Sequence, residues 1–313
     1  MKDSIKRAIP VSVLDWVYRR RMRFRIGREF RRDSKRYAAN AAFEDRVMPG
    51  RMSDSAIEVQ ATKDYHRVEK ALTLGAPKRP FGARVEARME RVQPLVPQGS
   101  VLSEYVSSAR SALSAWNSNG KIDDLVSPMA GSTHGLSTSD VEEFFSTRHS
   151  VRNFDSNRSV DISVLEDAAR LAMFTPSVCN RQASKVYFVT SEEMKAVARK
   201  RQNGNTGFGD IPVLAVVTVD TRLFAGPGER NQPWIDGGLF AMSLAWALHG
   251  VGLSSCMLNM SVTNSVSDAL RRDLQIEQHE VVIMQLAIGY PADGYRVARS
   301  PRRELGDVVR IVG

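Results

Sequence analysis

The sequence predicts a protein of two parts, in which a charged helical segment precedes a domain built around a sheet covered by helices. Three short apolar runs typical of buried strands predict the sheet, and they lie at Lys185–Thr190, Pro212–Val219 and Val281–Ile288. Helical patterns alternate with these runs from Ser139 onward. Such alternation favours a sheet with helices on its faces.

Composition and cysteine content exclude several classes of protein. The chain has 313 residues, of which 42% are hydrophobic and 25% charged, as in ordinary soluble domains. Its two cysteines cannot form a disulfide framework or a cysteine-rich metal centre, and they suit a reducing compartment. The apolar run Gly237–Leu253 is shorter than the roughly 20 residues that a transmembrane helix needs, and no secretory signal is recognised. We therefore predict a cytoplasmic protein without a metal.

The positive charge is concentrated at the start of the chain. Residues 1–40 hold 13 lysines and arginines against 4 acidic residues, which equals the net charge of +9 for the whole protein. Apolar residues recur among these charges, including Trp16, Phe24 and Phe30. Such a helix can lie on an anionic membrane surface at the inner face of the membrane, or it can pack on the main body with its charges in solvent. We do not expect nucleic acid as the partner, because no nucleic-acid-binding fold accompanies the segment.

The N-terminal part, residues 1–130, is expected to be a helical, basic extension with little strand pattern. Three helix-friendly stretches end at proline, glycine or asparagine: Asp64–Lys70, Glu86–Val92 and Leu102–Trp116. Residues 128–139 are rich in glycine, serine and threonine and have no periodicity. We place the boundary there and expect the second domain to cover residues 139–313.

Within the second domain, local signals predict the remaining elements. Capping-box spacing predicts helix starts at Ser139 and Ser163. A further helix is expected at Glu192–Lys200. The helix Asp236–His249 is apolar on most sides, which predicts that it is buried on most sides. Ser254–Leu258 is expected to add a strand.

Several common catalytic motifs are absent. The sequence has no G-x-x-x-x-G-K-[ST] loop for nucleoside triphosphates, no G-x-S-x-G nucleophile elbow, and no H-E-x-x-H pair among its five histidines. Cys179 and Cys256 are expected to be small core residues, because nothing near them in the sequence marks a base. What remains are segments suited to binding anions and amides.

The first such segment follows the predicted short helix. Arg148 and Arg152 lie four residues apart with Ser150 between them, and such a pair can hold one phosphate through charge-assisted hydrogen bonds. The alternative is a basic helix end, where arginine and histidine favour the helix dipole. The motif alone leaves both interpretations open.

Two further segments carry polar residues after breaks in the chain. Thr175–Gln182 is a polar turn after an apolar helix, and its Asn180 offers both donors and an acceptor to the edge of a heterocycle. Taken alone, the turn is better explained as an ordinary helix stop. Arg302 and Arg303 follow Pro301 and, taken alone, are most simply a solvated pair.

In this order and spacing, the segments resemble the FMN-dependent nitroreductase family. The stretch from Phe144 to Phe154 resembles the start of the family's domain, where an R-x-S-x-R motif grips the flavin phosphate and ribityl chain. Thr175–Gln182 resembles the family's P-S-x-x-N-x-Q segment, which faces the flavin, often from the partner subunit.

Two more stretches carry the same resemblance. Asp236-Gly237-Gly238 and Gly250–Ser255 resemble the family's long dimer helix and the G-x-G-L-x-S turn after it. Ala287–Pro291, followed by Pro301–Leu305, resembles the closing G-Y-P and the basic pair that returns to the phosphate. The resemblance covers the chain from Ser139 to its end.

The resemblance implies an α+β, nitroreductase-like fold with a central, mainly antiparallel sheet flanked by helices, in a homodimer whose flavin sites lie at the interface. It implies FMN as the cofactor and NAD(P)H as the electron donor. A small electron-poor acceptor, such as a nitro compound, quinone or enone, would then take the hydride in a ping-pong cycle. No catalytic residue is assigned. The residues implied to bind the cofactor are Arg148, His149, Ser150, Arg152, Pro176, Ser177, Asn180, Gln182, Ser254, Ser255, Arg302 and Arg303.

The chain also departs from the family's pattern. Ala183 stands where many members have a proline, and the segment 191–210 is short and lacks the helical insertion that roofs the site in several subgroups. These departures leave the form of the substrate pocket undetermined. They allow an alternative function, in which the protein is a low-turnover flavin-binding adaptor docked at a membrane through the basic arm. Tyr65–Leu72 and Arg79–Gly82 are similar to an extension on some bacterial nitroreductase-like proteins associated with surface-polysaccharide gene clusters.

Overall fold

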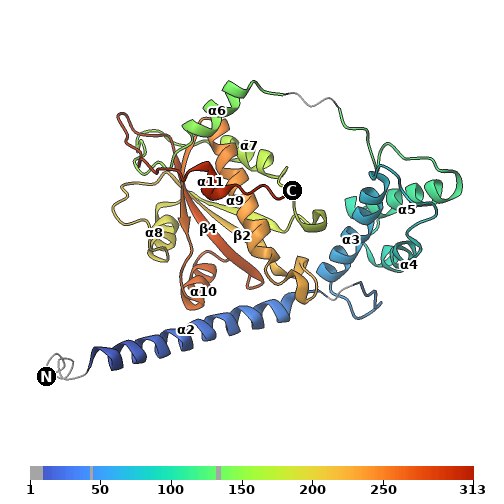
Figure 1. Ribbon diagram of the computed structural model, residues 1–313, viewed down its shortest axis with the longest axis horizontal. Coiled ribbons are helices and arrows are strands. Elements are labelled where there is room, and N and C mark those ends of the chain that lie inside the picture. Colours follow the sequence, from blue (N-terminus) through green and yellow to red (C-terminus); the bar gives the residue numbers. More distant parts are fainter. Residues whose placement is uncertain (1–9, 43–44, 132–134) are drawn as a thin grey trace.

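The computed structural model describes residues 10–42, 45–131 and 135–313 of the chain. Figure 1 shows a group of helices beside a larger domain built around a sheet, with one long helix running along the edge of the molecule. Residues 1–9 of the basic arm and residues 132–134 of the expected boundary lie outside the described ranges.

The N-terminal part is helical. Its helices are α2 (Val11–Asn40), α3 (Asp54–Leu72), α4 (Ala83–Val92) and α5 (Val101–Asn119). The last three pack around an apolar core that includes Val68, Met89 and Leu113. Helix α2 has no buried residue, and its N-terminal end projects away from the rest of the molecule (Figure 1).

Helix α3 joins the two parts of the protein. Seven consecutive residues, from Val59 to Tyr65, are buried, and such a run covers almost two turns of an α-helix and so every side of it. One side belongs to the core of the helical part. On another side, Val59 packs with Phe224 and Val281 of the sheet domain.

The polar residues of α3 are buried because they have partners. Asp64 is fully buried and accepts hydrogen bonds from Arg88 Nε at 2.9 Å, Arg67 Nη1 at 2.9 Å and Gln60 Nε2 at 2.7 Å. A buried carboxylate needs such partners, because its desolvation in their absence is costly. The cluster ties α3 to α4, from which Arg88 extends.

The sheet is antiparallel throughout its described strands. These are β1 (Ser184–Val189), β2 (Val213–Asp220), β3 (Ser254–Asn259) and β4 (Glu280–Gly289), in the spatial order β1-β2-β4-β3. All three neighbouring pairs are antiparallel, which confirms the α+β fold with a mainly antiparallel sheet. Every residue of β2 is buried, as expected for a near-continuous apolar run.

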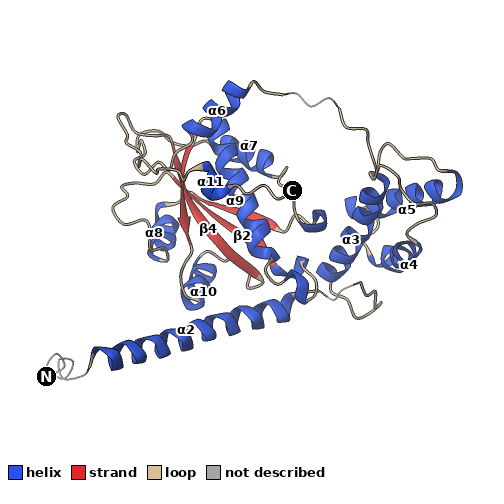
Figure 2. Cartoon of the chain, viewed as in Figure 1, coloured by secondary structure: helices blue, strands red, loops and turns tan. Residues whose placement is uncertain are grey.

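Helices cover both faces of the sheet (Figure 2). Val213, Ala215 and Val217 of β2 share a core with α7 (Ile162–Ala172) and α9 (Gln232–Gly250). The alternate residues Leu214 and Val216 share a second core with α8 (Glu192–Lys200) and α10 (Asn264–Asp273). Because successive strand residues point to opposite faces, the two helix pairs lie on opposite sides. Helices α6 (Thr138–Thr147) and α11 (Leu305–Val308) complete the domain.

Two expected helix starts are wrong. Helix α6 is capped by Ser137, whose Oγ accepts a hydrogen bond from Asp140 N at 3.2 Å, and not by Ser139. Ser137 and Asp140 have the same three-residue spacing as the capping box expected at Ser139, so spacing alone could not choose between them. Helix α7 begins after Asp161, whose side chain makes no capping hydrogen bond, and not at Ser163. Helix α10 was not expected from the sequence at all.

We predict that Asp64→Ala destabilises the protein by about 3–5 kcal/mol, because it leaves the guanidinium of Arg88 beside an empty, buried space. Urea unfolding followed by circular dichroism measures the change. Asp124→Ala, at an exposed acidic residue of the same helical part, serves as the control and should cost less than about 0.5 kcal/mol. Equal effects of the two substitutions would contradict the structural role of Asp64.

Candidate functional site

The segment after α6 is attached to the end of the sheet where β3 begins and β4 ends. Ser150 forms a parallel bridge with Ser255, and Val151 N donates to the carbonyl oxygen of Ser255 at 3.1 Å. Farther along, Asp155 N donates to the carbonyl oxygen of Tyr290 at 2.9 Å. The R-x-S-x-R segment therefore lies along the edge strand β3, beside the G-x-G-L-x-S turn.

An aromatic cluster positions Arg148 at this end of the sheet. Phe144 and Phe145 of α6 pack on Trp246 of α9, with ring centroids 5.2 and 4.5 Å apart. The Arg148 guanidinium lies 5.5 Å from the centroid of the Trp246 ring. Near the end of α9, Thr147 Oγ1 lies 3.1 Å from His249 Nε2. Burial lowers the pKa of His249, so this imidazole is neutral near pH 7.

Ser150 lies beside the start of β3, next to Cys256, and Arg152 Nη1 donates to the carbonyl oxygen of Ser150 at 3.2 Å. Burial raises the pKa of the Cys256 thiol, while Arg152, the Ser150 hydroxyl and Arg148 act on it in the opposite direction. Within the described residues, neither Arg148 nor Arg152 forms an ion pair with an acid. The structure thus brings together two arginines without counter-ions and a serine hydroxyl, which we call the arginine group.

Three other expected residues lie close to the arginine group. Ser254 and Ser255 open β3, with Ser254 half-buried and Ser255 buried, while His149 is exposed. Arg302 and Arg303, in contrast, are exposed, and Arg302 Nη1 donates to the carbonyl oxygen of Ser300. The structure does not bring this last pair into contact with the arginine group.

The P-S-x-x-N-x-Q segment forms a tight turn before β1, which we call the amide turn. Cys179, Asn180 and Gln182 have φ values of 49°, 54° and 48°, in the left-handed region that residues other than glycine seldom adopt. Ser177 Oγ accepts a hydrogen bond from Gln182 N at 2.9 Å. Pro176, Asn180 and Gln182 are exposed. Such strained backbone persists where surrounding contacts hold it, and it is frequent at binding sites.

A buried carboxylate on α9 holds the amide turn in place. Asp236, 2% exposed, accepts hydrogen bonds from Val178 N at 3.1 Å and from Gln232 Nε2 at 2.8 Å. The next residue, Gly237, lies so close to the sheet that an added Cβ would meet Ile283 at 2.5 Å. Asp236 was not expected to be a site residue, although a lone acid in an apolar helix was a usable signal.

The arginine group and the amide turn lie at opposite ends of the sheet. Ser254 pairs with Gly289, at the end of β4, and Val213 pairs with Ile288 beside it. The amide turn leads into Ser184, which pairs with Val219 at the far end of β2. The six steps from Val213 to Val219 along β2 span about 20 Å, at roughly 3.3 Å per residue. The two groups therefore do not meet within one chain.

Helix α9 runs between the two groups. Its start holds the amide turn through Asp236, and its end holds α6 through Trp246. Three large apolar side chains on this helix remain exposed: Trp234 at 46%, Ile235 at 51% and Leu239 at 45%. The expectation that the helix is buried on most sides is confirmed, and this exposed stripe is the part that lacks a cover.

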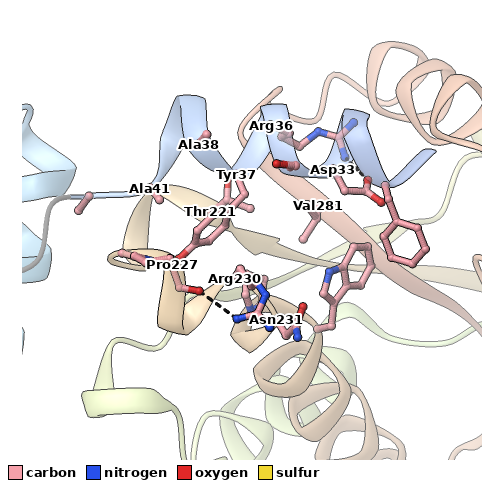
Figure 3. A pocket seen from close by; sticks show the side chains of 16 residues that line it. Asp33, Arg36, Tyr37, Ala38, Ala41, Thr221, Pro227, Arg230, Asn231 and Val281 are labelled. Carbon is pink, nitrogen blue, oxygen red and sulfur yellow. Dashed lines mark hydrogen bonds and ion pairs between the residues drawn. The ribbon is translucent and has the colours of Figure 1, made fainter. Parts of the chain in front are cut away.

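A cavity of about 700 Å³ lies elsewhere, between the C-terminal half of α2 and the start of α9 (Figure 3). The Tyr37 hydroxyl donates to the carbonyl oxygen of Gly226 at 2.7 Å, and Arg230 Nη1 donates to the carbonyl oxygen of Pro227 at 3.2 Å. None of the residues that line this cavity belongs to the arginine group or the amide turn. It is therefore separate from the site expected from the sequence.

Comparison with known families identifies the sheet domain. The sequence pattern of the nitroreductase family matches residues 145–205 and 192–290 of the chain. These residues include the arginine group, the amide turn and the four strands. The sheet domain therefore belongs to the nitroreductase family over the matched residues. A search of curated protein sequences finds no match.

Solved structures with this fold include a Bacillus subtilis protein described as a nitroreductase. The two share 18% sequence identity, with 56% of this chain and 99% of the other covered, at a TM-score of 0.50. A variant of the FMN- and NADPH-dependent nitroreductase NfnB from Sphigopyxis sp. is 22% identical, with 55% and 98% covered and a TM-score of 0.47. An FMN-dependent nitroreductase from Clostridium difficile is 19% identical, with 51% and 92% covered and a TM-score of 0.43.

The environment of Cys256 gives a testable prediction. Its thiol is 3% exposed and its pKa is raised by burial, so both access and thiolate content are low at pH 8. In a Cys179→Ser variant, we expect iodoacetamide to label Cys256 at least about tenfold more slowly in the folded protein than in urea. Mass spectrometry follows the label. Equal rates in the two conditions would show that this end of the sheet is open.

Proposed function

We propose that the protein is an FMN-dependent oxidoreductase that passes a hydride from NAD(P)H through the bound flavin to a small electron-poor acceptor. Membership of the nitroreductase family supports this function. The observation that carries it is the arginine group, because Arg148 and Arg152 carry two positive charges without counter-ions on either side of Ser150, which pairs with Ser255 at the start of β3. When bound, FMN would supply the hydride chemistry.

The arginine group has the chemistry that a flavin phosphate needs. A phosphate dianion is held most strongly by charge-assisted hydrogen bonds, and guanidinium groups present several donors in a fixed arrangement. Arg148 is oriented by its contact with Trp246, and the hydroxyls of Ser150 and Ser254 lie along the same edge of the sheet. These residues fit the phosphate and ribityl parts of FMN.

The amide turn has the chemistry that the flavin ring needs. The side chains of Asn180 and Gln182 offer both donors and acceptors to the amide-like edge of the ring. Both are exposed, and the backbone beneath them is fixed by Asp236. A rigid turn with solvent-facing amides can orient a flat ring without moving when the ring arrives.

A complete site requires a second copy of the chain, because the two groups lie at opposite ends of the sheet. If α9 packs against its own copy in the antiparallel direction, a two-fold axis near the middle of the helix places the amide turn beside the partner subunit's Arg148. The same packing covers the exposed stripe of Trp234, Ile235 and Leu239. We therefore propose a homodimer with two flavin sites at its interface.

Replacing both Arg148 and Arg152 with alanine is expected to weaken the binding of FMN more than the binding of riboflavin, because only FMN carries the phosphate. Each hydrogen bond to a charged group contributes about 1.5–3 kcal/mol, so FMN affinity should fall at least about 100-fold. Equilibrium dialysis of the apoprotein with each flavin measures the difference. Arg170→Ala, at an exposed arginine of α7, is the control and should change neither affinity. Equal weakening of both flavins would contradict the assignment.

A second candidate function, docking at an anionic membrane, is favoured by the exposure of α2. This helix holds nine arginines and one lysine against three acidic residues. Trp16 and Phe24 on it are 58% and 65% exposed. Within the described ranges, no helix combines the length and apolar character that are needed to cross a bilayer. We propose that α2 lies on the membrane surface instead of inserting through it.

The sheet domain holds the C-terminal half of α2 through polar contacts. Arg36 Nη2 lies 2.9 Å from Asp268 Oδ1, and Asn264 N donates to Glu29 Oε2 at 2.9 Å. The hydrogen bond from the Asn264 backbone is the main cause of the lowered pKa of Glu29. The packing alternative therefore applies to the helix from about Met22 onward, because Met22, Ile26 and Phe30 line a pocket together with Thr263 of the sheet domain. The N-terminal end of the helix projects away from the body (Figure 1).

We expect full-length protein to sediment with anionic vesicles at low salt and to be released by high salt. Basic residues near an anionic surface contribute about 1 kcal/mol each. Replacing Arg20, Arg21, Arg23 and Arg25 with glutamine should therefore abolish sedimentation and leave flavin content unchanged. Neutral vesicles are the control. Sedimentation of the variant equal to that of the wild type would assign the arm a purely structural role.

A further inference from the structure

The helical part forms one wall of a pocket that opens onto the amide turn. The pocket has a volume of about 480 Å³ and lies between α3, the start of α5 and residues 180–182. Pockets of this size hold small organic molecules. Asn180 and Gln182, the residues proposed to face the flavin ring, form the opposite wall.

Two tyrosines give this pocket an aromatic wall. The rings of Tyr65 on α3 and Tyr105 on α5 are tilted by 53°, with their centroids 5.5 Å apart. Tyr65 is 5% exposed, and its hydroxyl faces the side chains of Asn180 and Thr62. Tyr105 is 51% exposed and presents its ring to the cavity. Burial raises the pKa of Tyr65, so its hydroxyl stays protonated and able to donate.

The charges that line the pocket are mainly negative. Asp54 and Glu58 lie at its edge on α3. Burial and the nearby Asp220 raise the pKa of Glu58, while Arg222 and Lys185 act against them. Among the residues that line the pocket, the positive charge is that of Arg181. Its side chain is 1% exposed, and its Nη2 lies 2.8 Å from Glu229 Oε1. Its guanidinium is therefore neutralised by Glu229 and offers no surface to an anion in the cavity.

We propose that this pocket binds an uncharged aromatic electron acceptor and that the N-terminal helical part, through Tyr65, Tyr105 and the two acidic residues, decides which acceptors enter. This inference rests on the proposed flavin function, because that function places the ring beside the amide turn. An aromatic ligand stacks on the exposed Tyr105 ring, and Tyr65 donates a hydrogen bond toward a carbonyl or nitro oxygen. The acidic edge repels sulfonated or carboxylated analogues.

The segment between β1 and β2 is too short to cover the amide turn. The chain has only α8 and a loop at residues 191–210, which lie at the opposite end of β1 from the amide turn. A roof over the turn must therefore come from another part of the chain. Helix α3 occupies that place, since Val59 and its neighbours are packed directly on the sheet domain.

The test compares the binding of 1,4-naphthoquinone and of its 2-sulfonate by equilibrium dialysis, with full-length protein both with and without bound flavin. We expect the neutral quinone to bind the wild type about tenfold more tightly than the sulfonate. Tyr105→Ala should weaken the binding of the neutral quinone about tenfold, and Tyr105→Phe should retain most of that binding. Asp54→Asn with Glu58→Gln should bring the two affinities together. Glu104→Gln, next to the pocket but outside its lining, is the control.

The outcomes separate this proposal from the flavin function. If neutral quinone binding is unaffected by Tyr105→Ala, or if the acidic double variant leaves the preference unchanged, the pocket assignment is overturned even in a protein that carries flavin. If the protein takes up no flavin but the quinone binds and responds to Tyr105→Ala, the pocket stands and the flavin function fails. Circular dichroism of each variant confirms that it is folded.

Discussion

The antiparallel register of the sheet places the arginine group and the amide turn at opposite ends of the same domain. About 20 Å of β2 separates them. One chain can therefore offer either end to a ligand, but not both ends to the same ligand. Helix α9 connects the two groups, because it contacts one of them at each of its ends. It also exposes an apolar stripe along its side. A two-fold pairing of α9 would create two complete sites and cover the stripe in one step.

Helix α3 connects the helical part to the sheet domain. It is buried on every side along its middle, so the helical part and the sheet domain share it. Asp64 fixes α3 to α4 through Arg88, while Val59 fixes it to the sheet domain. This double attachment is what brings Tyr65 to Asn180. The helical part is thus joined to the candidate site by packing, while α2 contacts the sheet domain along its C-terminal half.

The sequence was informative where the signal is local. A strand buried on both faces leaves a continuous apolar run, so β2 could be predicted from Pro212–Val219 alone. The ordered motifs predicted the fold, which the family match confirms, whereas their roles in binding FMN remain predictions. The burial of α3 could not be predicted, because Asp64 is neutralised by Arg88, 24 residues away, and no local pattern encodes that pairing. The same reason hides the hydrogen bond from Val178 N to Asp236, which joins residues 58 positions apart.

We propose that the sheet domain holds a flavin and that a nicotinamide reduces it. The most direct measurement is the visible absorption spectrum of the purified protein, supplied with FMN if it is isolated without it, before and after anaerobic addition of NADH or NADPH. We expect flavin absorption at one FMN per chain, loss of that absorption on addition of one of the two donors, and its return on addition of an electron-poor acceptor. A protein that takes up no FMN, or whose bound FMN is reduced by neither donor, would overturn the flavin function.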